Sequence, residues 1–232
     1  MIPWSLLDTA QVPGGGELRL KRRGAEFSIM LGQIELMNSR LSRSEEALGT
    51  VACERIRTRE RPRILIGGLG MGFTLRAALA VLGTEARIIV AELVPPVLTW
   101  ARGPLAEVFG KSLTDPRVSI CEGDVGGLIR RGQSTFDAIL LDVDNGPEGL
   151  TRKANDTLYN VEGLSAAHAA LRPSGVLAVW SSGPNLDFTR RLRKTGFAVD
   201  QVRANANGAR GGPGHVIWIA TRADQGRSST RR

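Results

Sequence analysis

RILIGGLGMGFTLRAALAVLGTEARIIVAE, at residues 63–92, is the stretch that decides the fold of this 232-residue chain. An apolar run at 64–66 meets a cluster of glycines, a helical pattern follows at 73–82, and a second apolar run at 88–90 ends in Glu92. This order predicts a strand, a glycine-rich turn, a helix and a second strand.

Such a unit also predicts where a ligand binds. Glycines at a strand end let backbone amides approach a ligand, and the following helix directs its positive N-terminal end at the same place. The glycines are Gly67, Gly68, Gly70 and Gly72, and Glu92 lies at the distance where an acid accepts hydrogen bonds from ribose hydroxyls. The G-x-G-x-G spacing differs from the G-x-G-x-x-G dinucleotide fingerprint, so it favours a ligand of the S-adenosylmethionine type over NAD. A tight turn without a ligand is the alternative.

The composition is that of one large α/β domain with a small appendage. Hydrophobic residues make up 42% and charged residues 23%, which is ordinary for a globular protein. We find no apolar run long enough for a membrane span and no secretory leader pattern, so we expect a cytoplasmic protein without membrane contacts.

The net charge of +8 raises the question of nucleic acid binding. The arginines are spread along the chain, and the densest group lies in the tail from Arg222 to Arg232, beside glycine and serine. We interpret this tail as a solvated, disordered end and favour a generally basic protein, with nucleic acid binding kept as the less favoured alternative.

The remaining pattern predicts three segments. Residues 1–43 form a loose lead-in, up to residue 16, and then a small β-meander; residues 44–222 form a Rossmann-like nucleoside-binding domain; residues 223–232 form the basic tail. Within the domain, strands alternate with helices, including one continuous helix at 95–109, which predicts a doubly wound, mostly parallel sheet. The last two strands, near 197–202 and 215–221, are joined too closely for a crossover helix and must pair as an antiparallel hairpin.

Acidic residues follow several of the predicted strands. They are Glu92, Asp124, Asp142 and Asp144. Ligands bind beyond the carboxyl ends of the strands in open α/β sheets, so we expect these acids and the glycine turn to form one pocket. His168 and His215 have no partners that indicate a metal site, and we expect no metal.

The same motifs resemble those of the spermidine synthase family, the polyamine aminopropyltransferases, which have the class I S-adenosylmethionine-dependent methyltransferase fold. The matching stretches are Met30–Gly32, the glycine motif, Ala91–Pro95, Glu122–Asp124, Leu141–Asp142 with Gly146–Pro147, and Leu158–Tyr159. The resemblance implies a transferase of polyamine biosynthesis that uses S-adenosylmethionine or its decarboxylated form as co-substrate.

The resemblance also assigns residues to roles. It implies that Glu92 holds the ribose, with Leu93 beside it, that Asp124 faces the adenine amino group, with Val125 beside it, and that Asp142 stands at the reaction centre. An amine nucleophile must lose a proton, and a carboxylate can accept it, which makes Asp142 the candidate base.

Substrate-binding residues are expected after Asp142. Asp144 adds negative potential for a cationic substrate, as do Glu148 and Asp156, although these three acids can equally be solvated loop residues. Tyr159 stands where the family has an aromatic residue that contacts the substrate, and a packed ring is the alternative interpretation. The β-meander implies a homodimer, because an exposed sheet edge is costly to leave unpaired.

Two departures from the family keep other functions open. GGLGMG at 67–72 stands where the family has GGGDGG and so lacks its aspartate, and SEEAL at 44–48 replaces a Tyr-His-Glu motif that binds the amine. The first interpretation is an aminopropyltransferase acting on an amine. The second is a methyltransferase acting on a small molecule or RNA, and the third is a non-catalytic nucleoside-binding protein, which an Asp142 side chain turned away from the pocket would support.

Overall fold

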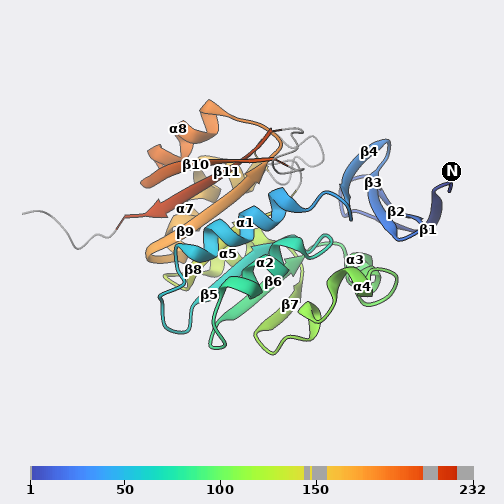
Figure 1. The fold of residues 1–232 in the computed structure, drawn as a ribbon. Helices are drawn as coiled ribbons and strands as arrows, with labels where there is room; N and C mark the ends of the chain where they lie inside the picture. The colour runs from blue at the N-terminus through green and yellow to red at the C-terminus, as the bar shows by residue number, and fades with distance from the viewer. Residues whose placement is uncertain (1, 144–146, 148–155, 206–213, 224–232) are drawn as a thin grey trace, which may run out of the picture.

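The chain folds into two sheets, a four-stranded N-terminal sheet and a seven-stranded sheet covered by helices (Figure 1). The structure is a computed structural model, and it describes residues 2–143, 147, 156–205 and 214–223. The predicted basic tail therefore lies almost entirely outside the described residues.

The N-terminal sheet is an antiparallel meander in the order β1-β2-β3-β4. Its strands are β1 (Ser5–Gln11), β2 (Glu17–Arg23), β3 (Glu26–Leu31) and β4 (Ile34–Asn38). The expected loose lead-in is wrong, because residues 5–11 form a strand. The glycine-rich breaker at 13–16 is the turn of a hairpin, in which Val12 N–H donates to Gly16 O and Gly15 N–H donates to Val12 O, so the residues before it pair with β2.

The larger sheet has the strand order β10-β11-β9-β8-β5-β6-β7. The strands are β5 (Arg63–Gly67), β6 (Arg87–Glu92), β7 (Val118–Glu122), β8 (Phe136–Leu141), β9 (Leu171–Ser181), β10 (Phe197–Asn205) and β11 (Gly214–Arg222). Among the described strands of this sheet, β11 pairs antiparallel with β10 and β9, and the other pairings are parallel. The predicted, mostly parallel sheet and the C-terminal hairpin are both confirmed. Strand order reverses between β5 and β8, which puts the topological switch point beside Asp142.

Helices cover both faces of this sheet (Figure 1). One face packs against α1 (Arg43–Glu54), α2 (Phe73–Val81) and α3 (Pro95–Arg102). The other face packs against α5 (Val125–Arg131), α6 (Asp156–Tyr159), α7 (Val161–Ala170) and α8 (Leu186–Lys194). The expected single helix at 95–109 is wrong, because Gly103 and Pro104 break it and the chain resumes as α4 (Ala106–Phe109) before the short turn η1 (Ser112–Thr114).

Side-chain alternation explains why the sheet is buried on both sides. On β5, Ile64 and Ile66 join the core beneath α1 and α2, whereas Leu65 joins the core beneath α5 and α7. A strand whose successive residues point to opposite faces is apolar throughout only when both faces are covered. The apolar run at 64–66 therefore indicates that β5 is a central strand of the sheet, covered on both faces.

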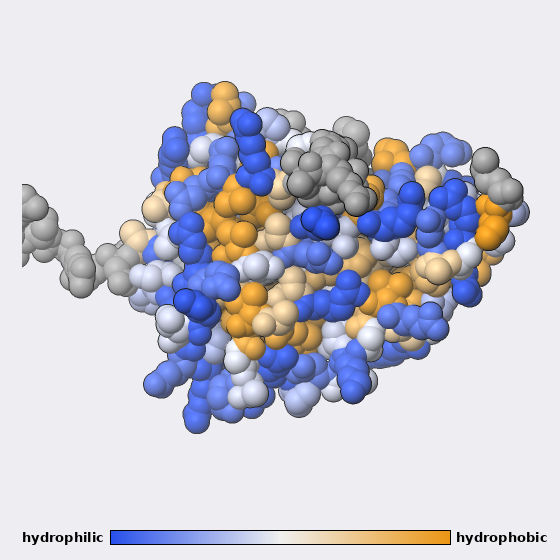
Figure 2. All heavy atoms as spheres, viewed as in Figure 1, coloured by the Kyte–Doolittle hydropathy of each residue, from blue (hydrophilic) through white to orange (hydrophobic). Residues whose placement is uncertain are grey.

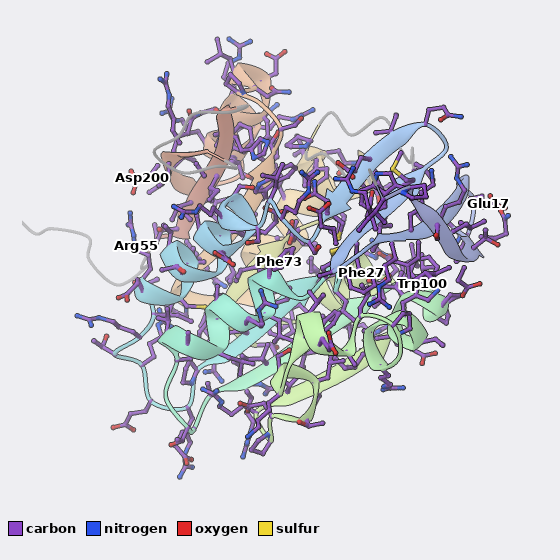
Figure 3. The ribbon with its side chains drawn as sticks, turned by 45° about the vertical axis from the view of Figure 1, so that its right-hand side comes forward. Glu17, Phe27, Arg55, Phe73, Trp100 and Asp200 are labelled. Atoms are coloured by element: carbon purple, nitrogen blue, oxygen red, sulfur yellow. The ribbon has the colours of Figure 1, made fainter. Side chains whose placement is uncertain are left out.

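Two polar contacts connect distant parts of the chain. Trp100 on α3 donates a hydrogen bond from Nε1 to Asp8 on β1, at 2.7 Å, and Figure 3 shows Trp100 beneath the N-terminal sheet. Asp137 lies near the start of β8, the end opposite to Asp142. Its buried carboxylate accepts hydrogen bonds from Arg59 at 2.6 Å and Arg172 at 2.9 Å. The first contact anchors the N-terminal sheet, and the second joins the loop before β5 to the start of β9.

The face seen in Figure 2 is hydrophilic over much of its rim, and hydrophobic residues show in its middle and at the outer end of the N-terminal sheet, beside the start of the chain. Ile2, Leu6 and Leu7 are exposed there.

Among the helices that the structure describes, none is both long and apolar enough to cross a membrane.

Candidate active site

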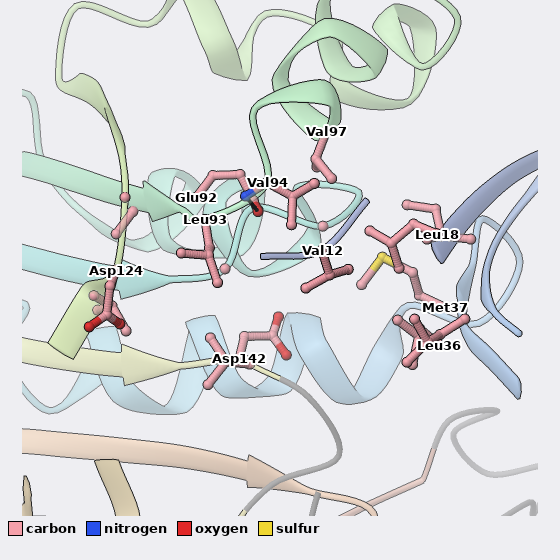
Figure 4. A pocket seen from close by; sticks show the side chains of 18 of the residues that line it. Val12, Leu18, Leu36, Met37, Glu92, Leu93, Val94, Val97, Asp124 and Asp142 are labelled. Carbon is pink, nitrogen blue, oxygen red and sulfur yellow. Dashed lines mark hydrogen bonds between the residues drawn. The ribbon is translucent and has the colours of Figure 1, made fainter. Parts of the chain in front are cut away.

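A cavity lies between the carboxyl ends of β5, β6, β7 and β8 and the N-terminal sheet (Figure 4). In Figure 4, Asp124 marks one end, Leu36 and Met37 mark the other, and Glu92 and Asp142 face each other across the middle. The predicted residues that line it are Gly68, Gly70, Glu92, Leu93, Asp124, Val125 and Asp142. Residues from four separate strand ends are thus brought to one place.

The glycine turn forms the floor beside β5. Gly68 and Gly70 line the cavity, whereas Gly67 ends the strand and Gly72 precedes α2. Gly68 has a φ of +87°, and a Cβ atom on it would lie 2.4 Å from the carbonyl oxygen of Asp142. Its lack of a side chain therefore allows β8 to continue past the turn and present Asp142 to the cavity.

The Glu92 carboxylate is buried at the end of β6, with 7% of the residue exposed. The backbone N–H of Leu69 donates to one oxygen at 3.0 Å, and that of Val94 donates to the other at 2.8 Å. Burial raises the pKa of Glu92, and these hydrogen bonds oppose the rise. The backbone N–H groups of Leu93 and Gly70 act on this carboxylate in the same direction, and together the backbone donors fix its orientation.

At the far end of the cavity, Asp124 connects β7 to α5. Its side chain caps the helix by accepting a hydrogen bond from Gly126 N at 3.0 Å, and its other oxygen pairs with Arg130 at 3.2 Å. Leu93 and Val125 supply apolar atoms on either side of this end of the cavity.

Asp142 follows β8 and reaches the middle of the cavity. Its Oδ2 accepts a hydrogen bond from the Thr74 hydroxyl at 2.7 Å. Burial, reinforced by the negative charge of Glu45, raises the pKa of Asp142 to about 7, while the Thr74 hydrogen bond acts in the opposite direction. The group can therefore gain and lose a proton near neutral pH.

The sequence did not reveal the wall of the cavity opposite the sheet edge. The N-terminal sheet and the turn between its strands β1 and β2 supply this wall, with apolar atoms from Val12, Leu18, Ile29, Leu31, Leu36 and Met37. Alternation identified the strands, but it cannot show what their apolar face packs against. The sequence predicts that the meander contacts a second subunit, and the structure shows that its residues also line the cavity.

Glu45 and Thr74 were also missed. Both lie beside Asp142, on α1 and α2. A signal for Glu45 was present, because the stretch at 44–48 aligns with the amine-binding motif of the resembling family. Thr74 had no such signal, since a threonine in the first turn of a helix is ordinary.

One predicted substrate residue, Tyr159, does not line the cavity. The ring of Tyr159 packs edge-on against Phe188 with centroids 5.7 Å apart, and 2% of the residue is exposed. This placement favours the packing interpretation of Tyr159. Asp144 and Glu148 lie outside the described residues, as does the side chain of Asp156.

Comparison of the sequence with known proteins finds polyamine aminopropyltransferases. The chain is 27% identical over 188 residues to polyamine aminopropyltransferase 2 of Pseudomonas aeruginosa, covering 75% of this chain and 52% of that protein. It is 30% identical over 145 residues to the polyamine aminopropyltransferase of Mycobacterium tuberculosis, covering 59% and 27%. The chain therefore spans about half the length, or less, of these curated relatives. No protein-family profile matches it.

Solved structures agree on the fold. The spermidine synthase of Thermotoga maritima superposes with a TM-score of 0.75 at 19% identity, over 94% of this chain and 73% of that one. The chain resembles polyamine aminopropyltransferases in sequence and spermidine synthases in fold. Human methyltransferase-like protein 13, solved in complex with SAH, gives a TM-score of 0.56 at 19% identity, over 80% and 82%. These matches confirm the predicted resemblance and the predicted methyltransferase-like fold.

Proposed function

We propose that the protein is an aminopropyltransferase that binds decarboxylated S-adenosylmethionine and transfers its aminopropyl group to an amine of the polyamine type. The similarity to polyamine aminopropyltransferases supports the reaction class. The geometry of the cavity supports the choice of co-substrate.

One observation carries this choice, namely the charge of the cavity. Glu92, Asp124 and Asp142 line it, and among the described lining residues there is no lysine, arginine or histidine. A negative cavity favours a sulfonium and an ammonium ion. It disfavours the carboxylate that S-adenosylmethionine carries and its decarboxylated form lacks, because that carboxylate has no described cation to pair with.

The nucleoside half is proposed to bind along the sheet edge. Glu92 accepts hydrogen bonds from the two ribose hydroxyls, since its backbone donors already hold the carboxylate in place. Asp124 accepts from the adenine amino group, and Leu93 and Val125 hold the ring between them. The glycine turn then lies beside the sulfonium end of the ligand.

Asp142 is proposed as the base. An ordinary aspartate, with a pKa of 3.8, would take a proton from an amine of pKa 10.4 at a cost of about 9 kcal/mol. A pKa of about 7 reduces that cost to about 5 kcal/mol. The raised pKa therefore removes nearly half of the penalty for generating the nucleophile.

In the proposed reaction the amine nitrogen attacks the carbon that is bound to the sulfonium. A carbon–nitrogen bond forms, the carbon–sulfur bond breaks, and its electron pair stays on sulfur to give methylthioadenosine. The proton lost by nitrogen goes to Asp142. Alignment of nitrogen, carbon and sulfur is the main contribution that the site makes to the rate.

Isothermal titration calorimetry tests the assignment with decarboxylated S-adenosylmethionine, S-adenosylmethionine and methylthioadenosine as ligands. We expect the decarboxylated form to bind at least about tenfold more tightly than S-adenosylmethionine. Product analysis by mass spectrometry should then show an amine extended by one aminopropyl group. Failure to bind any of the three ligands would exclude an enzyme of this class.

Methyl transfer is the second candidate, and the glycine motif favours it. The stretch GGLGMG at 67–72 lacks the aspartate that the resembling family has in its glycine motif. Tighter binding of S-adenosylmethionine in the same titration would support this candidate. The third interpretation, a non-catalytic protein, required Asp142 to turn away from the pocket, but Asp142 lines the cavity.

We also propose a homodimer and a cytoplasmic location. Ile2, Leu6 and Leu7 expose apolar surface on and beside β1, which is an edge strand of its sheet. Both cysteines of the chain are free thiols, as is usual in a reducing compartment. Light scattering at micromolar concentration should give twice the monomer mass, and a monomer mass would refute the dimer.

A further inference from the structure

The Thr74 hydroxyl lies between two oxygen atoms. Its Oγ1 is 2.7 Å from Asp142 Oδ2 and 3.2 Å from the backbone carbonyl oxygen of Glu45. A hydroxyl has one proton, so it can donate to only one of them at a time. When Asp142 is ionised, Thr74 donates to it. When Asp142 is protonated, the acid can donate to Oγ1 and Thr74 can donate to the Glu45 carbonyl, with no movement of heavy atoms.

Close packing of two helices creates this arrangement. A Cβ atom on Gly49 of α1 would lie 2.6 Å from the carbonyl oxygen of Thr74, so glycine at this position lets α1 lie directly against α2. Glu45 is four residues before Gly49 and thus on the same side of α1. The Glu45 carboxylate is thereby held close enough for its charge to act on Asp142.

Burial and the negative charge of Glu46 raise the pKa of Glu45, and a hydrogen bond from the Ser44 hydroxyl opposes the rise. Glu46 on α1 accepts a hydrogen bond from Ser42 and lies 3.9 Å from Arg76 of α2. Glu92 and Asp124 have the backbone partners described above. Within the part of the chain that the structure describes, neither Glu45 nor Asp142 forms an ion pair with a lysine or arginine. Two nearby carboxylates without a cation favour the uptake of a positive charge or a proton.

We propose that Glu45 and Asp142 form one proton-accepting pair, which binds the acceptor as an ammonium ion when both carboxyls are ionised and then takes a single proton from it. The inference rests on the proposed function and extends it to a second carboxyl and a positioning residue. The proton goes to Asp142 Oδ2 as the nitrogen–hydrogen bond breaks, and Thr74 turns its own proton to the Glu45 carbonyl. Glu45 keeps its negative charge and stays beside the new carbon–nitrogen bond.

The experiment is a pH titration of the ligand-free protein with ¹³C-labelled carboxyl groups, followed by NMR. The test variants are Glu45→Gln, Thr74→Val and Thr74→Ser. The control is Glu54→Gln, on the last residue of α1 and half exposed. Circular dichroism confirms that each variant folds.

In the wild-type protein we expect the midpoint of the Asp142 titration to lie near neutral pH. Glu45→Gln should lower it by about one pH unit or more, because the neighbouring charge is gone. Thr74→Val should raise it by about half a unit or more, since the hydrogen bond to the ionised form is lost, and Thr74→Ser should restore it. Glu54→Gln should leave it unchanged.

An Asp142 titration that is unchanged in Glu45→Gln would overturn the pair. A Thr74→Val titration equal to that of wild type would overturn the role of the hydroxyl, and Thr74→Ala, which also lacks the hydroxyl, takes its place if that variant does not fold. The titration needs no substrate. A pair that titrates as expected in a protein that fails to bind methylthioadenosine would therefore refute the proposed function and leave the pair standing.

Discussion

Gly68 and Asp142 are in contact across the switch point of the sheet: a Cβ atom on Gly68 would lie 2.4 Å from the carbonyl oxygen of Asp142. The backbone N–H of Asp142 also donates to Gly67 O at 3.0 Å. The turn proposed to face the nucleoside and the residue proposed to take the proton therefore form one backbone unit. A change in the turn must change the position of the base.

Gly68→Ala tests this relationship. The new Cβ would displace the Asp142 backbone, and alanine would be held at a φ of +87°, so we expect a loss of about 2–3 kcal/mol of stability. Denaturant unfolding measures this loss, and calorimetry should show at least about tenfold weaker binding of methylthioadenosine. Gly83→Ala is the control, because a Cβ there meets nothing within 4 Å. Equal effects of the two substitutions would refute the relationship.

Glu92→Gln should weaken methylthioadenosine binding by about ten- to a hundredfold, the worth of a hydrogen bond to a charged group. An amide must also place its NH₂ group against the N–H of Leu69 or Val94, both of which are donors. Glu122→Gln, an exposed residue paired in register with Glu92 on β7, is the matched control in the same titration. Unchanged affinity in Glu92→Gln would remove Glu92 from the nucleoside site.

Asp142→Asn should stabilise the protein at alkaline pH. Folding raises the pKa of Asp142 from 3.8 to about 7. The contribution of Asp142 to the free energy of unfolding is therefore fully favourable only below pH 3.8, and it is lost as the pH rises to about 7. Asparagine has no such dependence, so the variant should match the wild type near pH 4 and exceed it by on the order of 3 kcal/mol at pH 8. Urea unfolding at the two pH values measures the difference, and a constant offset would contradict it.

The rate of amine transfer should fall below neutral pH. The proposed base must be ionised to accept a proton, so kcat/KM for the amine should decrease about tenfold per pH unit below pH 7. Initial rates with decarboxylated S-adenosylmethionine measure this profile. Glu45→Gln should move the break to lower pH, and a profile that is flat from pH 5 to 7 would exclude Asp142 as the base.

Asp137→Asn should destabilise the fold without affecting the site. Its carboxylate accepts from Arg59, from Arg172 and from the backbone N–H of Arg63 at 2.8 Å, so we expect a loss of about 2–4 kcal/mol. Asp200→Asn is the control, because its pair with Arg55 is exposed and worth less than about 1 kcal/mol (Figure 3). Methylthioadenosine affinity should be unchanged in both folded variants.

Local patterns predicted most of the fold. The apolar runs, the glycine turn and the short connection before β11 each fix the backbone over a few residues, and the structure agrees with them. The two errors have local causes as well. The breaker at 13–16 predicts a loose lead-in but is a hairpin turn, and Gly103 and Pro104 interrupt the helix predicted at 95–109.

The site was harder to predict because part of it depends on contacts between distant elements. Strand order brings the acids of β6, β7 and β8 together, and a sequence pattern can anticipate that. The approach of α1 to α2 at Gly49, which places Glu45 near Asp142, depends on tertiary packing. So does the apolar wall from β2, β3 and β4, since alternation is the same whether a sheet covers a cavity or another subunit.

That wall divides the pocket between two regions of the chain, the N-terminal strands and the edge of the larger sheet. The sheet edge supplies the acids and glycines, whereas residues such as Leu18, Leu36 and Met37 supply the opposite side. Substitutions in the N-terminal strands can reshape the space for the acceptor while the nucleoside half stays intact. A few substitutions in the first 40 residues can therefore change which acceptor the proposed enzyme prefers. We expect selection for new acceptors to act fastest when mutations are confined to those strands.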